Sequence, residues 1–160
     1  MSIDVTLTQE EMEIAAMIGC RRMAESLANR RLSYEWHLPD DTWGTDIEGA
    51  AAEMAFCKAM NRFWSGSVNT FKDADVGENV QIRATTHSNG CLIVRDNDPD
   101  DEYFVLVVGK APDYSVKGWI LGGDAKQDEY KKAPNGDPPA YFVPQRALTE
   151  INRRQKPGSR

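Results

Sequence analysis

The polar residues Gln81 and Arg83 stand two positions apart in a short apolar segment, residues 80–84. In a strand, residues two apart point to the same face, so this amide and this guanidinium project together while Ile82 faces the opposite way. An amide beside a guanidinium suits contact with a phosphate or a carboxylate group. Asp75 lies across a tight turn from this segment, within reach of the same face. The spacing therefore indicates a polar site suited to an anionic group.

Two helical segments precede this strand. Thr8 and Glu11 have the spacing of a capping box, and apolar residues at helical spacing continue from there to about Leu32. A second helical pattern covers residues 46–63, and its first half is rich in Gly and Ala. A helix with such small side chains can lie close to a sheet or to another backbone. Glu53 belongs to this second helix.

Beyond residue 66 the apolar period changes to two, which is typical of strands. Gly, Asn, Asp and Pro separate the apolar segments, as expected of turns. Strands are predicted at residues 68–71, 80–84, 91–94, 103–108, 114–121 and 141–143, and a short helix capped by Asp124 is predicted over residues 124–131. Helices followed by strands predict an α+β (α/β) fold, with N-terminal helices packed on a central mixed sheet of about five strands.

Length and composition bound the class of protein. The chain of 160 residues predicts one domain over residues 1–150, followed by a basic flexible tail at 151–160. The net charge of -6 argues against a protein that coats nucleic acid by charge alone, although it leaves room for a local contact. No apolar run is long enough to cross a membrane and no signal segment is evident, which predicts a cytoplasmic protein. Three cysteines without a CxxC pair are expected to be buried free thiols: Cys20, Cys57 and Cys91.

The order of an acid on a helix, an acid before a turn and a polar pair on the next strand resembles the PD-(D/E)XK nuclease superfamily. Glu53 matches the helix acid of that family, Asp75 matches its aspartate, and Gln81-Ile82-Arg83 stands where acid-x-lysine belongs. The motif lies within residues 46–86, and beyond it the chain resembles the family only in the order of its strands, to about residue 150. The resemblance implies a restriction-endonuclease-like core, and it is closest to small phage and prophage members of the superfamily.

A member of that superfamily would be a metal-dependent nuclease that hydrolyses phosphodiesters of DNA, including branched or structured DNA. The resemblance implies an Mg²⁺ or Mn²⁺ site with Asp75 as the bridging ligand, joined by the Gln81 amide oxygen and the Ile82 carbonyl, while Glu53 holds a metal-bound water. Arg83 would contact the phosphate. A phage-encoded protein of this kind would work in the host cytoplasm, and many nucleases of this fold act as homodimers.

Three departures from the family pattern bear on this expectation. Ala74 replaces the usual proline, which is a common relaxation. Gln81 replaces an acid and removes one negative charge from the metal site, so metal affinity should fall. Arg83 replaces lysine, and a guanidinium stays protonated and cannot accept a proton from water, although it can still grip a phosphate. The alternative is a catalytically inactive nuclease-fold protein that binds nucleic acid or a protein partner.

Other residues compete for the same roles. Asp124 and Lys126 form a literal D-x-K, but Asp124 is also the expected helix cap. Glu78, three residues after Asp75, is an alternative to the missing acid, but its place in a turn fixes the direction of its side chain poorly. The acidic run at residues 96–102 lacks the glycine and glutamate spacing of a calcium loop and predicts a solvated hairpin turn instead.

The remaining candidates carry weaker signals. The two histidines are His37 and His87, and His87 follows the candidate strand closely enough to relay protons at its margin. Arginines near the start of the chain, Arg22 among them, are expected to be solvated. The four tryptophans are scattered, so they predict no base-stacking platform. Phe104 and Trp119 are predicted to lie in the core.

Overall fold

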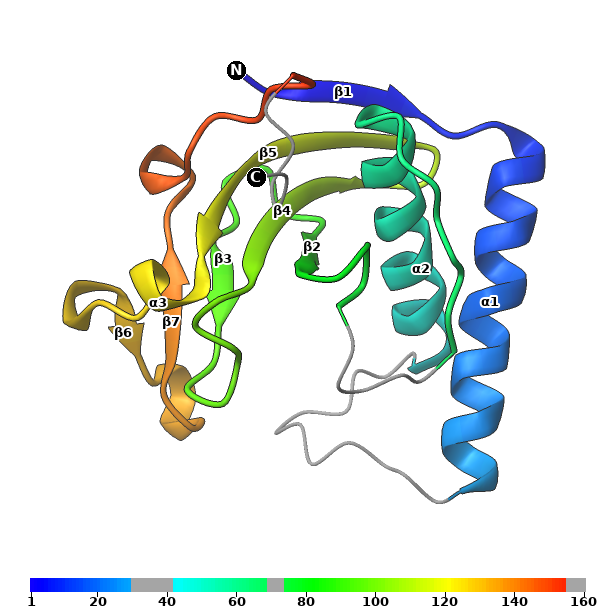
Figure 1. Cartoon of the computed structure of the whole chain (residues 1–160). Helices are drawn as coiled ribbons and strands as arrows, with labels where there is room; N and C mark the ends of the chain where they lie inside the picture. The colour runs from blue at the N-terminus through cyan, green and yellow to red at the C-terminus, as the bar shows by residue number, and fades with distance from the viewer. Residues whose placement is uncertain (30–41, 69–73, 155–160) are drawn as a thin grey trace.

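The computed structural model describes residues 1–29, 42–68 and 74–154, in which helices and strands are joined by short turns (Figure 1). Its elements are, in order, β1 (Ile3–Thr6), α1 (Gln9–Ala28), α2 (Thr42–Ala59), β2 (Val80–Thr85), β3 (Leu92–Val94), β4 (Tyr103–Lys110), β5 (Asp113–Leu121), α3 (Gly122–Ala125), β6 (Lys131–Lys132) and β7 (Ala140–Val143). Single turns of 3₁₀ helix occur at Asp128–Tyr130, Pro134–Gly136 and Gln145–Ala147.

The strands form two sheets. The larger has four strands in the order β1-β5-β4-β2, and it is mixed because β2 runs parallel to β4 while the other pairs are antiparallel. The smaller is antiparallel, with three strands in the order β3-β7-β6. The α+β prediction is confirmed: two N-terminal helices pack on a four-stranded mixed sheet. The single sheet of about five strands is wrong, because β3 leaves the sheet of β2 and pairs with β7 instead.

Strand β4 separates two apolar clusters. Val105 and Val107 point toward the helices, whereas Phe104 and Leu106 point toward the smaller sheet, and all four are buried. This burial on both faces explains why the strand reads as a continuous apolar run and not as an alternating one. The larger sheet is therefore the middle layer, with α2 and α1 on one side and β3 and β7 on the other (Figure 1).

Helix α1 begins at the predicted capping box. The Glu11 amide donates to the Thr8 hydroxyl over 3.2 Å, and the Thr8 amide donates to the Glu11 carboxylate over 2.7 Å. Lys58 on α2 donates to the same carboxylate over 2.7 Å, which ties the start of α1 to the end of α2. The helix ends at Ala28, and the predicted continuation to Leu32 lies outside the described residues.

Helix α2 is the thin helix that its composition predicts, and it contacts α1, β1, β2, β4 and β5. The run Ala50, Ala51 and Ala52 is buried, and Gly19 of α1 meets the backbone of α2 at Ile47. The helix starts four residues before the predicted residue 46. It also ends earlier than residue 63, because Asn61 adopts a left-handed φ of 51° and the Arg62 amide donates back to the Cys57 carbonyl over 2.8 Å.

Replacing Gly19 by Ala is expected to destabilise the protein by about 2 kcal/mol. A β-carbon at this position would stand 2.5 Å from the Ile47 α-carbon, so one helix must shift. Gly49 on α2 is the matched control, because its added methyl meets nothing within 4 Å, and Gly49→Ala should stabilise the helix by about 0.5–1 kcal/mol. Urea unfolding of both variants measures the difference, and equal effects would contradict the close helix contact.

Several local predictions differ from the structure. Strand β1 was missed by the sequence reading, although the alternation in Ile3–Thr6 carries its signal. The short helix α3 is capped at Leu121 and contains Asp124 within it, so the Asp124 cap is wrong: the chain turns directly at the end of β5. The predicted strand at residues 68–71 lies mostly outside the described residues. The strand at 141–143 is confirmed as β7.

The end of the chain and the cysteines differ in part from what the sequence predicts. Ile151 is buried and the Arg153 guanidinium donates to the Ala59 carbonyl over 3.1 Å, so the predicted tail boundary at residue 151 cuts through a packed segment. Among the cysteines, all free, Cys57 is buried as predicted, whereas Cys20 is exposed on α1. None of the helices in the described residues is long and apolar enough to cross a membrane.

Candidate functional site

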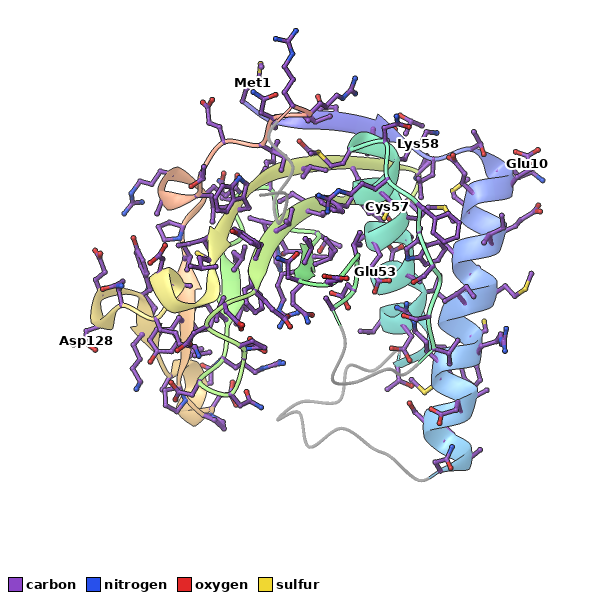
Figure 2. The ribbon with its side chains drawn as sticks, viewed as in Figure 1. Met1, Glu10, Glu53, Cys57, Lys58 and Asp128 are labelled. Carbon is purple, nitrogen blue, oxygen red and sulfur yellow. The ribbon has the colours of Figure 1, made fainter. Side chains whose placement is uncertain are left out.

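Glu53 is a charged side chain buried in the helical layer, with only 7% of its surface exposed. Arg22 of α1 binds it with two parallel hydrogen bonds of 2.8 and 2.9 Å, and the Trp64 indole donates a third of 3.0 Å. Glu53 and Cys57 lie one turn apart along α2 (Figure 2). A buried carboxylate needs such partners, because an unpaired charge in the interior is strongly unfavourable. The predicted acid therefore sits in a fixed position.

Asp75 lies beside β2, the last strand of the larger sheet. Its carboxylate accepts the Ile82 amide over 2.6 Å, and the next residue, Val76, forms an isolated antiparallel bridge with Val80. Burial and the nearby charge of Glu53 raise the pKa of Asp75 from its ordinary 3.8 to about 6, against the lowering effects of the Ile82 amide, Arg83 and Arg22. The two predicted acids are therefore close enough to repel each other.

The raised pKa of Asp75 predicts a pH dependence of stability. Below about pH 3 the carboxyl is protonated in both states. As the pH rises toward 6 the unfolded chain ionises while the folded protein keeps the proton, so the folded state loses up to about 3 kcal/mol relative to the unfolded state. Asp75→Asn, which keeps an acceptor for the Ile82 amide, should gain up to this amount over wild type above pH 6. Urea unfolding across pH without divalent cations tests this, and a pH-independent difference would refute it.

Gln81 and Arg83 project together from β2 as predicted, but both side chains contact the loop between β3 and β4. The Gln81 amide nitrogen donates to Glu102 over 2.8 Å. The Arg83 guanidinium donates to Asp98 over 3.1 Å and to the Ile82 carbonyl over 3.4 Å, and it lies 5.0 Å from the centre of the Phe104 ring. The pair thus holds carboxylates of its own chain.

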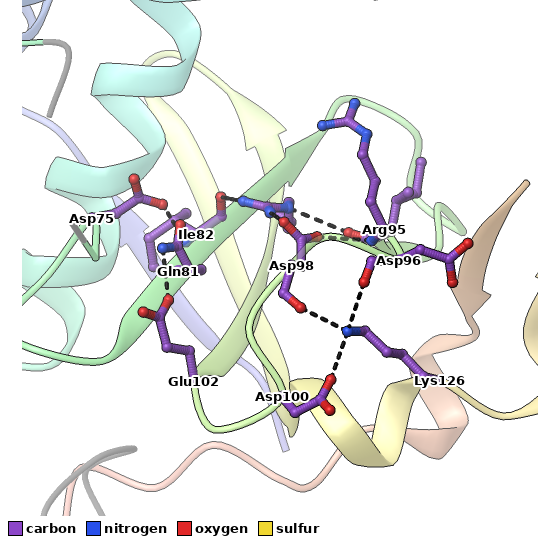
Figure 3. A network of polar contacts seen from close by, with 11 residues as sticks. Asp75, Gln81, Ile82, Arg95, Asp96, Asp98, Asp100, Glu102 and Lys126 are labelled. Atoms are coloured by element: carbon purple, nitrogen blue, oxygen red, sulfur yellow. Dashed lines mark hydrogen bonds and ion pairs between the residues drawn. The ribbon is translucent and has the colours of Figure 1, made fainter. Parts of the chain in front are cut away.

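The loop at residues 96–102 is held in place by contacts with side chains from later in the chain (Figure 3). Lys126 donates to the carbonyls of Asp96 and Asp98 and to the Asp100 carboxylate over 2.6–3.1 Å, and the Tyr141 hydroxyl donates to Asp96 over 2.9 Å. The predicted solvated hairpin turn is wrong, because the strands on either side belong to different sheets. Lys126, the lysine of the competing D-x-K, therefore binds this loop.

The predicted site residues fall into two groups around the outer side of β2. Glu53 and Asp75 come together on the side of the helices, while Gln81 and Arg83 lie on the side of the smaller sheet. Arg83 still lowers the pKa of Asp75, so the two groups of residues interact electrostatically. The sequence reading missed their partners, namely Arg22, Trp64, Asp98, Glu102 and Lys126. No local spacing reveals such partners, because Arg22 and Glu53 are 31 residues apart.

The two acids beside β2, Glu53 and Asp75, do not by themselves make up a metal site. Within residues 1–29, 42–68 and 74–154, no group of three or more His, Cys, Asp and Glu side chains is arranged to hold a metal ion. The oxygens that the resemblance assigns to a metal lie on two sides of β2, because the Asp75 carboxylate is on the side of the helices and the Gln81 side chain binds Glu102 on the other side. Magnesium is held by one or two carboxylates when water and phosphate oxygens complete its shell. Two carboxylates would therefore leave most of the shell of an ion to water and phosphate oxygens.

The other candidates lie away from this cluster or outside the described residues. Glu78 is exposed in the turn after Asp75, and His87 is exposed in the turn after β2. His37 lies outside the described residues. Comparisons of the chain with protein-family models, with curated proteins and with solved structures give no match.

Proposed function

We propose that this protein is a metal-dependent nuclease that hydrolyses phosphodiester bonds of DNA. The observation that supports the proposal is the nearness of two acids, Glu53 from a helix and Asp75 from the bend before β2, where burial and then the charge of Glu53 raise the pKa of Asp75 to about 6. Two carboxylates held together at this cost are a common feature of functional sites. Their order with β2 also supports the resemblance to the PD-(D/E)XK core.

Each residue has a role in this proposal. Asp75 is the charged ligand of an Mg²⁺ or Mn²⁺ ion, and the Ile82 carbonyl and the Gln81 amide oxygen are neutral ligands. The hydrogen bond from the Gln81 nitrogen to Glu102 turns the amide oxygen away from that acid. Glu53, fixed by Arg22, orients a water through its carboxylate. The bound ion would supply a more acidic water and neutralise charge on the phosphate.

Arg83 is the candidate for contact with the phosphate. Its guanidinium remains charged and donates in a planar fork, so it stabilises negative charge without acting as a base. It must exchange Asp98 for a phosphate oxygen to do so, at an ion pair of 3.1 Å whose side chains are 27% and 16% exposed. The expected substrates include branched or structured DNA.

A second candidate is a protein of the same fold that binds nucleic acid or a protein partner without cleavage. The observation that favours it is the internal pairing of the polar residues: Arg22 holds Glu53, Glu102 holds Gln81 and Asp98 holds Arg83. With these pairs intact, few charges remain for catalysis. The two candidates differ in whether a divalent cation binds beside Asp75 and a phosphate replaces Asp98 at Arg83.

The deciding experiment incubates the purified protein with supercoiled, linear and branched DNA in the presence of Mg²⁺, Mn²⁺ or EDTA. Cleavage that requires the cation supports the nuclease. Binding of Mn²⁺, followed by the paramagnetic broadening of NMR signals from β2 residues, should accompany it. If every DNA remains intact under all conditions while the protein still binds DNA or a protein, the second candidate replaces the first.

A further inference from the structure

Phe63 is the most exposed large apolar side chain in the described residues, with 87% of its surface open to solvent. It follows the end of α2, where the Asn61 turn redirects the chain. The backbone around it is fixed: the Cys57 thiol donates to the Phe63 carbonyl over 3.8 Å, and the next residue, Trp64, donates to Glu53. A rigid backbone therefore presents this ring to solvent.

The Phe63 ring lines a surface hollow of about 370 Å³. Its other lining residues are Arg62, Val76, Gly77, Glu78 and Asn79. This volume is within the range of roughly 300–1,000 Å³ found for small-molecule sites. An aromatic ring, an aliphatic wall and polar groups that donate and accept hydrogen bonds are what a flat heterocycle requires. The lining thus matches a nucleobase, which offers a π-face and a polar rim.

The walls of the hollow are attached to the two acids of the candidate site. On one wall, Phe63 is followed by Trp64, whose indole binds Glu53. On the other wall, Val76 follows Asp75, and Gly77, with a left-handed φ of 63°, makes the turn that sets Glu78 and Asn79 in place. A base in the hollow would therefore bring its neighbouring phosphates toward the Asp75 side of β2.

We propose that this hollow binds an unpaired nucleobase, stacked on Phe63, so that the substrate is DNA with single-stranded nucleotides at the cut. This inference deepens the proposed function and rests on it for the cleavage step. A base within a duplex cannot enter a pocket without leaving the stack, so continuous duplex would bind weakly.

The test measures binding of a short fluorescein-labelled single-stranded oligonucleotide, and of the same sequence as duplex, by fluorescence anisotropy in EDTA. Wild type should bind the single strand about 10-fold or more tightly than the duplex, and Phe63→Ala should lose about 10-fold in single-strand affinity. Phe63→Trp should retain that affinity. Trp43→Ala is the matched control, because Trp43 is an exposed aromatic residue in the first turn of α2, the helix that precedes Phe63, and should have no effect.

Equal affinity for single strand and duplex, or an unchanged affinity of Phe63→Ala, would overturn the inference. Circular dichroism of each variant keeps a folding defect from being read as a binding defect. The cleavage assay with Mg²⁺ or Mn²⁺ is separate: binding that depends on Phe63 without any cleavage would support the base pocket and overturn only the nuclease. Cleavage of continuous duplex as fast as single strand would overturn the base pocket and support the nuclease.

Discussion

Asp75→Asn is expected to abolish cation-dependent cleavage, with a loss of about 100-fold or more. The substitution removes the charged ligand of the proposed site and keeps nearly the same shape. The carbonyl oxygen of the new side-chain amide can still accept the Ile82 amide, so the turn before β2 should stay in place. Rates of cleavage of a branched DNA under single-turnover conditions measure the effect, and thermal unfolding with and without Mn²⁺ measures the loss of the cation site.

Asp128→Asn is the control for this variant. Asp128 is exposed and lies on the far side of the smaller sheet (Figure 2), so its carboxylate should influence neither cleavage nor the stabilisation by Mn²⁺. If Asp75→Asn cleaves DNA as fast as Asp128→Asn does, Asp75 is not a ligand and the proposed metal site is wrong. If both variants and wild type fail to cleave DNA, the result supports the alternative of a protein that binds without cleavage.

Arg22→Ala is expected to lower the free energy of unfolding by about 3–5 kcal/mol. The substitution leaves the buried Glu53 carboxylate without its two strongest hydrogen bonds, and the Trp64 indole alone cannot replace them. The side chains of Arg22 and Glu53 are only 14% and 9% exposed, so water does not easily take over the lost contacts. Urea unfolding at neutral pH measures the change.

The adjacent Arg21 supplies the control for this second variant. Arg21 is exposed on α1, so Arg21→Ala should change the free energy of unfolding by no more than about 0.5 kcal/mol. The double variant Arg22→Met with Glu53→Met should recover much of the stability lost in Arg22→Ala, because it removes the stranded charge as well. Equal losses for Arg21→Ala and Arg22→Ala would show that the ion pair contributes little.

Features that depend on neighbours in sequence could be predicted from the sequence. The capping box joins Thr8 to Glu11 across three residues, and the alternation around Gln81 and Arg83 follows from strand geometry. A close contact of α2 with another backbone was also predicted, and the structure has one, although Gly19 of α1 allows it and not the small residues of α2. In each case the physical cause lies within one turn or one strand, where spacing alone determines direction.

Features that depend on distant partners could not be predicted. The pairing of Arg22 with Glu53 and the transfer of β3 to a second sheet are decided by packing across long separations, for which local spacing carries no signal. Asp98 and Glu102 looked like solvated turn residues because their partners, Arg83 and Gln81, are on another strand. The candidate site residues themselves stay predictions until cleavage and metal binding are measured.

The contacts of Asp75 and Arg83 also affect how the molecule behaves in solution. Strand β2 is an edge strand of the larger sheet. At this edge the Ile82 amide donates to the Asp75 carboxylate, and the Ile82 carbonyl accepts from the Arg83 guanidinium. Uncovered groups of this kind pair with strands of other molecules and promote aggregation. Asp75→Ala should therefore precipitate more readily than Asp75→Asn, so any aggregated Asp75→Ala sample would reflect intermolecular strand pairing and not the chemistry of the site.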